Sequence, residues 1–544
     1  MVPYRYCCGG GLISTLMMTV LANAAAGMMK VEYSWVFVDY TFASPNHRES
    51  AIKSGKFIPE NCVILDVDTF YDTSDGKLLL NMGSNTAPKQ RVFVTIPRIK
   101  PGNPASIAEI VPGDSPKSVL LAPYPNWKAN TISENKLNCD DTIVSVFRTK
   151  IDHLGRFWVV DVGTVNQFEN TIHSVCPPKL LIFDLKNNDR VIKTYQFLSS
   201  HVKENSLFTN IEVDVRDSNG RNTFAYISDT TAFKLIVYDF KNDDSWIIDQ
   251  AYFYPFPNKA HFKINGVNFD LMDGLLGLAL GPKIQNDRKL YFHAFASIRE
   301  SWVYTNTLQN KSLFQNGLID GSGTFFLSSE VRETQSSVEV MTNSGVLIYA
   351  SMDNSLSCWN SQDPFTSKYT HMIYKNDEDF QFPTGMKIVG DKLWAVSCQL
   401  QNHFTTMVTN RKSIKCRVLV GRIDDLIRRT GCNKRTMFND YNDEVLVDSF
   451  DNNILHEWPG VPTDTEPWSY SRMSRVFENK NGIKQSLVKS LVLTGNVNVH
   501  SHSKPKSRSY DCRMNMINGQ LKSHDCLGKS HRKSRVRRRS GPLR

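Results

Sequence analysis

The sequence lacks the short motifs that mark several large enzyme classes. Its 544 residues contain no G-x-S-x-G, H-E-x-x-H or G-x-x-x-x-G-K-[ST] pattern. There is therefore no sequence signal for a hydrolase nucleophile, a zinc peptidase or a phosphate-binding loop. No C-x-x-C pair occurs either, so the cysteines show no zinc-ligand spacing. We expect neither a bound metal nor a cofactor.

The histidines are also poor candidates for catalysis. His153 lies in an expected turn, and His261, His293 and His371 are isolated in the sequence. Histidines of this kind are more often hydrogen-bonded structural side chains than catalytic bases. The sequence thus names no pair of acid and base.

Long apolar runs are absent after the first 27 residues. Residues 12–27, LISTLMMTVLANAAAG, follow Arg5 and end in small residues. A basic start, a short apolar stretch and a small-residue end are typical of a secretory signal peptide, which we assign to residues 1–26. A buried helix or a membrane anchor is the alternative, but the run is short for a span. We expect a secreted, extracellular protein with no membrane span.

The body of the chain has no excess of positive charge. The formal net charge is +10, but residues 501–544 contain 13 Lys and Arg against 2 Asp and Glu, a charge of +11. The near-neutral remainder excludes nucleic acid as the main partner. The basic composition of 501–544, poor in apolar residues, predicts a disordered tail. A simple solvated tail is favoured over a processing site or a cluster that binds polyanions.

The cysteine count indicates disulfides. Cys7 and Cys8 fall within the expected signal peptide, which leaves nine of the 11 cysteines. In an exported protein these are bridge candidates before they are metal ligands. Because nine is odd, at least one thiol is free or pairs between chains. Asn310 begins the only N-x-[ST] sequon, a candidate glycosylation site.

A recurring pair of strand-like runs organises the rest of the chain. Residues 144–164, VSVFRTKIDHLGRFWVVDVGT, alternate apolar and polar residues to Ile151, turn at 152–155 and continue as an apolar strand. Five further copies can be recognised: 63–67 with 91–94, 211–214 with 224–227, 267–269 with 275–278, 338–340 with 346–349, and 386–389 with 393–396.

Six copies with about four short strands each predict an all-β fold, a six-bladed β-propeller. The alternative is a pair of β-sandwich domains. We place the propeller at residues 31–432, an irregular extension at 433–500 and the basic tail at 501–544. Residues 46–54 are expected to be helical.

Several motifs resemble the insect yellow and major royal jelly protein family. They extend from about residue 32 to residue 432 and include RVFVTIPR at 91–98, PYPNW at 123–127, GRFWVVDVG at 155–163, CPP at 176–178, NIEVD at 210–214, INGVNF at 264–269, SCWN at 357–360 and FPTGMK at 382–387. The resemblance independently implies a six-bladed propeller. It also implies the disulfides Cys139–Cys176 and Cys358–Cys432. Cys398 and Cys416 flank a hairpin-like loop and are a candidate third pair, while Cys62 has no evident partner.

The resemblance further implies a small aromatic amine or a catechol as ligand in the propeller channel. By approximate alignment, the ligand-facing residues are Thr334, Gln335, Ser336, Tyr349 and Ser351. A hydroxyl or amide there would hold a catechol hydroxyl, and Tyr349 would stack on the ring. Tyr349 is equally compatible with a role in the blade core. This set contains no acidic residue to pair with an ammonium group, which weakens the amine version.

Three functions follow from the resemblance. We favour a secreted protein that binds catecholamine-derived or indole-derived molecules in melanin pigmentation or in hardening of cuticle or eggshell. The second is a dopachrome-converting enzyme of the tautomerase type, whose chemistry needs a base and an acid that face the ring. The third is a structural matrix protein whose tail contacts acidic matrix components.

Overall fold

The computed structural model describes residues 29–71, 90–111, 119–133, 137–169, 172–314, 323–404, 413–434, 510–517 and 520–528. The chain divides into two units, Met1–Ser490 and Leu491–Arg544. The predicted signal peptide at 1–26 lies outside the described residues, as does the extension after residue 434.

The first unit contains six four-stranded antiparallel sheets. The first three blades are β2 (Asp66–Tyr71), β3 (Gln90–Thr95), β4 (Ile107–Val111) and β5 (Leu120–Pro123); β6 (Val146–Ile151), β7 (Arg156–Asp161), β10 (Lys179–Asp184) and β11 (Arg190–Gln196); and β12 (Phe208–Val215), β13 (Thr223–Asp229), β14 (Lys234–Asp239) and β15 (Asp244–Asp249).

The other three blades complete the set. They are β18 (Leu275–Leu280), β19 (Lys289–Ala294), β20 (Ser301–Tyr304) and β21 (Phe325–Leu327); β22 (Ser336–Met341), β23 (Val346–Ser351), β24 (Ser355–Asn360) and β25 (Thr370–Lys375); and β26 (Pro383–Val389), β27 (Lys392–Ser397), β28 (Cys416–Arg422) and β1 (Lys30–Trp35).

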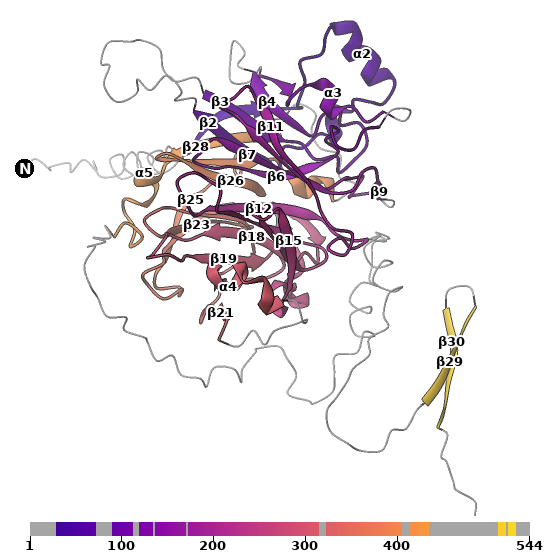
Figure 1. Cartoon of the computed structure of the whole chain (residues 1–544), viewed down its shortest axis with the longest axis vertical. Helices are drawn as coiled ribbons and strands as arrows, with labels where there is room; N and C mark the ends of the chain where they lie inside the picture. Colours follow the sequence, from indigo (N-terminus) through magenta and orange to yellow (C-terminus); the bar gives the residue numbers. More distant parts are fainter. Residues whose placement is uncertain are drawn as a thin grey trace, which may run out of the picture. The chain divides into compact units, whose positions relative to one another are not determined.

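The six sheets close into a ring. The first strands of successive blades, β2, β6, β12, β18, β22 and β26, are neighbours in that order, and β26 returns to β2. The last sheet also joins both ends of the ring, because β1 pairs with β28 from Lys30 opposite Val420 to Trp35 opposite Cys416. Figure 1 shows the orange C-terminal strands beside the indigo N-terminal blade. The six-bladed propeller is confirmed, and the pair of β-sandwiches is excluded.

The hairpin of β6 and β7 has the features that the sequence indicated. Every residue of β7 is buried, as expected for a strand that lies inside a packed sheet. Asp152 accepts backbone hydrogen bonds from Leu154 and Arg156 at 3.0 Å each. Gly155 follows with a φ of 84°, a conformation that favours glycine. Asp and Gly therefore fix the turn.

The fourth repeat differs from the prediction. Residues 267–269 do not form the first strand of a blade but belong to β17 (Val267–Asp270), which pairs with β16 (His261–Ile264) in a separate hairpin. The rings of Phe262 and Phe269 stack there with centroids 5.2 Å apart. The first strand of the blade is β18 instead. The prediction was wrong because both segments have strand-like apolar patterns, and only tertiary pairing separates them.

Helices are few and short. The predicted helix at 46–54 is α2 (Pro45–Lys53), whose N-cap Ser44 accepts a hydrogen bond from the His47 amide. The remaining short elements are η1 (Pro59–Asn61), α3 (Trp127–Asn130), β8 (Thr164–Val165), β9 (His173–Ser174), η2 (Ala251–Phe253), η3 (Pro257–Lys259), α4 (Thr305–Gln309), η4 (Lys311–Phe314), η5 (Leu400–His403) and α5 (Ile423–Ile427). Among the described residues, no helix has the length and apolar character that a bilayer span requires.

Three disulfides link described residues. They are Cys139–Cys176, Cys358–Cys432 and Cys398–Cys416, with Cα–Cα distances of 5.5, 6.3 and 4.0 Å. All three are the predicted pairs. Cys62, for which no partner was evident, is a buried free thiol.

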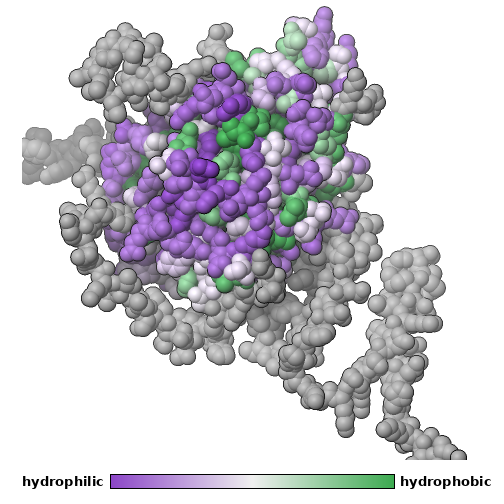
Figure 2. Space-filling view, in the orientation of Figure 1, coloured by the Kyte–Doolittle hydropathy of each residue, from purple (hydrophilic) through white to green (hydrophobic). Residues whose placement is uncertain are grey.

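The apolar core lies within and between the blades, with Trp158 and Trp394 among its largest fully buried side chains. The face in view in Figure 2 is mostly hydrophilic, with small separate hydrophobic patches. In the second unit, β29 (Tyr510–Ile517) and β30 (Gln520–Gly528) form an antiparallel hairpin that brings Cys512 opposite Cys526 in the backbone register. The other residues of the predicted basic tail lie outside the described residues.

Candidate functional site at the propeller hub

The innermost strands carry charged side chains that bind the next blade. Asp66 of β2 accepts a hydrogen bond from the Thr149 amide at 3.0 Å, and it forms an ion pair with Lys387 of β26 at 2.8 Å. Lys150 of β6 forms an ion pair with Glu212 of β12, also at 2.8 Å. These contacts join four of the six blades around the axis. Charge is buried at the hub because each of these ions has a partner on a neighbouring strand.

Hydrogen bonds from side chains to backbone carbonyls complete the ring at the other blade junctions. Side chains there bind backbone carbonyls of the next blade: Asn210 Nδ2 donates to Leu276 O at 2.9 Å, His293 Nε2 to Ser336 O at 3.1 Å, and Ser337 Oγ to Pro383 O. Every junction of the six blades therefore has at least one polar bridge near the axis.

Arg148 reaches across the hub. From β6 in the second blade, its Nη2 donates to Ser337 O in the fifth blade at 2.8 Å, and its Nε donates to Thr384 O in the sixth at 3.0 Å. The side chain is only 6 % exposed, and burial lowers the pKa of the guanidinium to about 10. At this level the hub is spanned by a side chain and is not an open channel.

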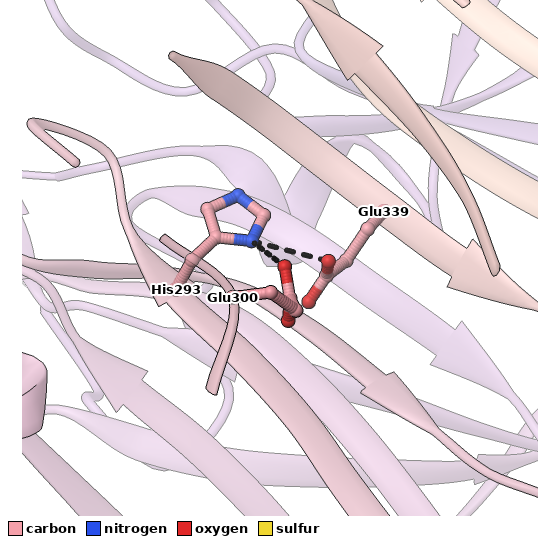
Figure 3. Close-up of side chains that lie close together, drawn as sticks. All are labelled: His293, Glu300 and Glu339. Atoms are coloured by element: carbon pink, nitrogen blue, oxygen red, sulfur yellow. Dashed lines mark hydrogen bonds and ion pairs between the residues drawn. The ribbon is translucent and has the colours of Figure 1, made fainter. Parts of the chain in front are cut away.

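A second group of buried side chains lies between the fourth and fifth blades. His293 of β19 points toward Glu300, which precedes β20, and toward Glu339 of β22 (Figure 3). His293 Nδ1 is 3.2 Å from Glu300 Oε2 and 3.1 Å from Glu339 Oε2. Arg332 Nη1 contacts the same oxygen of Glu300. All four side chains are at most 1 % exposed.

The hydrogen-bond geometry restricts which atoms of this group can carry protons. Because His293 Nε2 donates to Ser336 O, the neutral ring would present a bare Nδ1 to two carboxylates. That arrangement is repulsive unless a proton lies on His293 or on one of the glutamates. Burial opposes protonation of His293, but the carboxylates of Glu339 and Glu300 together outweigh it, and the pKa of His293 is raised.

The surroundings shift the pKa values of the two glutamates in opposite directions. Burial and the neighbouring carboxylate of Glu339 raise the pKa of Glu300 to about 7. Burial opposes ionisation of Glu339 as well, but His293 and Arg332 together outweigh it, and the pKa of Glu339 is lowered. Two carboxyls with separated pKa values are suited to different roles, one as a base and one as a proton store.

The same group offers ligand atoms of the kinds that a divalent cation binds. One atom each from His293, Glu300 and Glu339 lies within 4.8 Å of the others. However, Arg332 already supplies a positive charge at Glu300. A buried divalent cation would have to share that carboxylate with a guanidinium. The residues therefore fit a bound proton better than a metal ion.

Several polar atoms around the hub are buried without a hydrogen-bond partner. They include Arg148 Nη1, Thr384 Oγ1, Glu339 Oε1 and Glu300 Oε1. Buried groups of this kind are rare in folded proteins, since desolvation without a partner costs free energy. Arg148 Nη1 and Thr384 Oγ1 are thus unpaired donors, and Glu339 Oε1 and Glu300 Oε1 are unpaired carboxyl oxygens.

The predicted ligand-facing residues are close to this site, but the side chains of Thr334 and Gln335 are already engaged in hydrogen bonds. Gln335 Nε2 donates to Lys259 O and His261 O at 2.8 and 3.1 Å, and Thr334 Oγ1 donates to Gln335 Oε1. Ser336 and Ser351 face each other in the register of β22 and β23. Tyr349 is buried in a blade core opposite Glu339, with the Arg332 guanidinium 5.6 Å from the centre of its ring.

Sequence reasoning missed most of the hub. His293 was set aside as isolated, although its partners Glu300 and Glu339 meet it in space, and Arg148 was not considered. A signal was present in the first strand of most repeats, where one or two charged residues interrupt an apolar run: DVD at 66–68, RTK at 148–150, IEV at 211–213, VEV at 338–340 and MKI at 386–388.

The sequon residue Asn310 is exposed at the C-terminal end of α4. The Ser312 hydroxyl donates to Asn310 Oδ1 at 2.6 Å. The site is therefore accessible to modification, and its glycosylation stays a prediction.

A closed six-bladed propeller with a charged hub and a buried acid–base group defines the class of this protein. The model of the family described as Major royal jelly protein matches residues 144–432. The chain belongs to this family, which includes the yellow proteins.

Named relatives support the assignment. The chain is 30% identical over 414 residues to "Dopaminechrome tautomerase" of Drosophila melanogaster, covering 74% of this chain and 84% of the relative. It is 30% identical over 441 residues to "Protein yellow" of Drosophila guanche, covering 78% and 72%. It is 29% identical over 435 residues to "Protein yellow" of Drosophila melanogaster, covering 78% and 74%. A role related to pigmentation, as in the family, agrees with the expectation from sequence.

Proposed function

We propose that this chain is a secreted protein that binds an oxidised catecholamine of the aminochrome type at the hub and catalyses its tautomerisation. The observation that carries the proposal is the group of His293, Glu300 and Glu339 beside Arg148, which provides the acid and base that the sequence could not name. A relative that covers most of the chain is named for this activity toward dopaminechrome.

The chemistry sets clear requirements. Tautomerisation of an aminochrome moves hydrogen from saturated ring carbons to the quinone oxygens, so carbon–hydrogen bonds break and oxygen–hydrogen bonds form without an external oxidant. A base must accept the proton, an acid must return one, and a donor must stabilise the oxygen as negative charge develops.

The hub residues match these roles. Glu339 acts as the base, because its pKa is lowered and its Oε1 lacks a hydrogen-bond donor, while Oε2 faces His293 Nδ1. Arg148 Nη1 is an unpaired donor that can bind a polar group of the ligand and hold it beside Glu339. His293 and Glu300 hold protons behind Glu339 and return one to the product. The ligand is thus expected beside Arg148, between this side chain and Glu339.

The test is the decay of dopaminechrome absorbance with purified protein. Glu339→Gln is expected to lower the rate by about 100-fold or more, the usual contribution of a general base. Glu330→Gln is the matched control, because Glu330 precedes the same blade but is exposed. Equal rates for the wild type and Glu339→Gln, with both folded, would refute the assignment. Absence of turnover in the wild type would refute the enzyme.

Binding without turnover is the second candidate. Arg148 is held by backbone carbonyls of two blades, and a fixed donor of this kind favours binding whether or not chemistry follows. Calorimetric binding of dopamine or a catechol, with no change in aminochrome absorbance, would support this function. The contact of the basic tail with acidic matrix components stays a prediction.

Export is part of the proposal. Three disulfides and an exposed sequon support passage through an oxidising compartment. Expression in insect cells is expected to yield protein in the medium that lacks residues 1–26. Asn310→Gln is expected to remove a shift in mass on glycosidase treatment. Retention of the intact chain inside the cell would contradict export.

A further inference from the structure

Arg148 differs from the other cations at the hub. Lys150 is paired with Glu212, and Lys387 with Asp66. Among the described residues, no carboxylate forms an ion pair with Arg148, whose hydrogen bonds all go to backbone carbonyls. A buried guanidinium without an anionic partner is costly, since the charge is desolvated and only partly compensated.

A second donor lies next to Arg148. Thr384 accepts hydrogen bonds from the arginine through its carbonyl, while its own hydroxyl is buried without a partner. The Nη1 of Arg148 is also without a partner. Two unpaired donors on adjacent groups, one of them charged, match the two oxygens of a carboxylate.

The nearby carboxylates do not fill this role. Asp66 accepts hydrogen bonds from Lys387 and from the Thr149 amide, and Glu339 faces His293. Each of these anions thus has its own cation. An anionic group on a ligand would supply the charge that Arg148 lacks and would also satisfy both donors.

We propose that Arg148 and Thr384 form a recess for a single carboxylate, so that the hub selects planar aromatic ligands that carry one over their neutral counterparts. The inference rests on the proposed function for the place of the ligand, but it does not require turnover. It specifies an acidic ligand class, in contrast to an amine.

The test uses matched pairs of probes. Indole-2-carboxylate and indole-2-carboxamide have nearly the same shape and differ in charge. By calorimetry and thermal shift, the full-length protein is expected to bind the carboxylate about tenfold or more tightly, as for a charge-assisted hydrogen bond in a buried site. Arg148→Gln is expected to remove this preference, and Arg148→Lys to keep part of it.

Arg98→Lys is the matched control, because Arg98 is also buried and bound to backbone carbonyls such as Asn103 O and Pro104 O. It is expected to leave the preference unchanged. Should the Arg148 variants fail to fold, the comparison of the two probes on the wild type still decides. Equal binding of both probes, or binding of neither, would overturn the inference.

Turnover separates the inference from the proposed function. Dopachrome carries a carboxylate that dopaminechrome lacks, so dopachrome is expected to have the lower KM. Conversion of both with the same KM would refute the recess and leave the tautomerase intact. A preference for indole-2-carboxylate without conversion of either aminochrome would support the recess and refute the tautomerase.

Discussion

The ion pair of Lys387 and Asp66 provides the sharpest test of how the ring is held closed. Lys387 belongs to the last blade and Asp66 to the first, and their side chains are 2.8 Å apart and 8 % and 0 % exposed. Removing one member of a buried pair leaves the other charge without compensation, which typically costs about 3–5 kcal/mol. We therefore expect Lys387→Met and Asp66→Asn each to lower the free energy of unfolding by about this amount.

The double variant should recover most of the loss, since neither charge then remains buried and unpaired. The assay is urea unfolding followed by tryptophan fluorescence, with Trp158 and Trp394 as buried reporters. A surface pair supplies the control. Lys375 and Asp353 are 3.0 Å apart but 42 % and 40 % exposed, so Lys375→Met should cost at most about 1 kcal/mol. If Lys387→Met costs no more than Lys375→Met, the hub pair does not close the ring.

Three further predictions concern other parts of the body. Burial raises the pKa of Asp68 to about 7. Between pH 4 and 7 the folded state then binds more protons than the unfolded state, so the free energy of unfolding should fall by up to about 4 kcal/mol as the pH rises through this range. Asp68→Asn should flatten the profile in thermal unfolding at each pH; an unchanged slope would contradict the assignment. Cys358→Ser opens a 74-residue loop and should cost about 2–5 kcal/mol in the same assay, whereas no change would mean that the bridge is dispensable. Gly385→Ala should cost about 1–3 kcal/mol, because a Cβ there would lie 2.5 Å from Asp66 Oδ1; wild-type stability would show that β26 and β2 can separate locally.

The fold was largely predictable because its signals are local. Buried apolar runs recur in each blade, and in the hairpin of β6 and β7 they are separated by a turn that contains Asp152 and Gly155. The disulfides followed from motifs of the family and from a flanking pair. The fourth repeat was assigned incorrectly because β17 and β18 are both short apolar strands, and only their partners distinguish a hairpin from a blade.

The hub was not predictable in the same way. His293 lies on β19, Glu300 in the loop before β20, and Glu339 on β22 of the next blade. Their positions in the sequence do not indicate that His293 Nδ1 lies 3.1–3.2 Å from the two carboxylates. Arg148 is nearly 190 residues away from Ser337, whose carbonyl it binds. Charged residues in apolar strands were a visible anomaly, but the sequence alone does not show which of them meet.

The charged side chains of the hub fall into two groups: pairs that hold the ring of blades closed, and side chains that keep unpaired atoms. Asp66, Lys387, Lys150 and Glu212 are bound to one another across blade junctions, and replacing them should affect stability first. Arg148 and Glu339 retain unpaired atoms after folding is complete, and the free energy of leaving these atoms without partners is opposed to stability. Under the proposed function, a ligand at the hub satisfies these groups. Substitutions that neutralise Arg148 or Glu339 and keep their shape should therefore reduce binding or turnover more than they reduce stability.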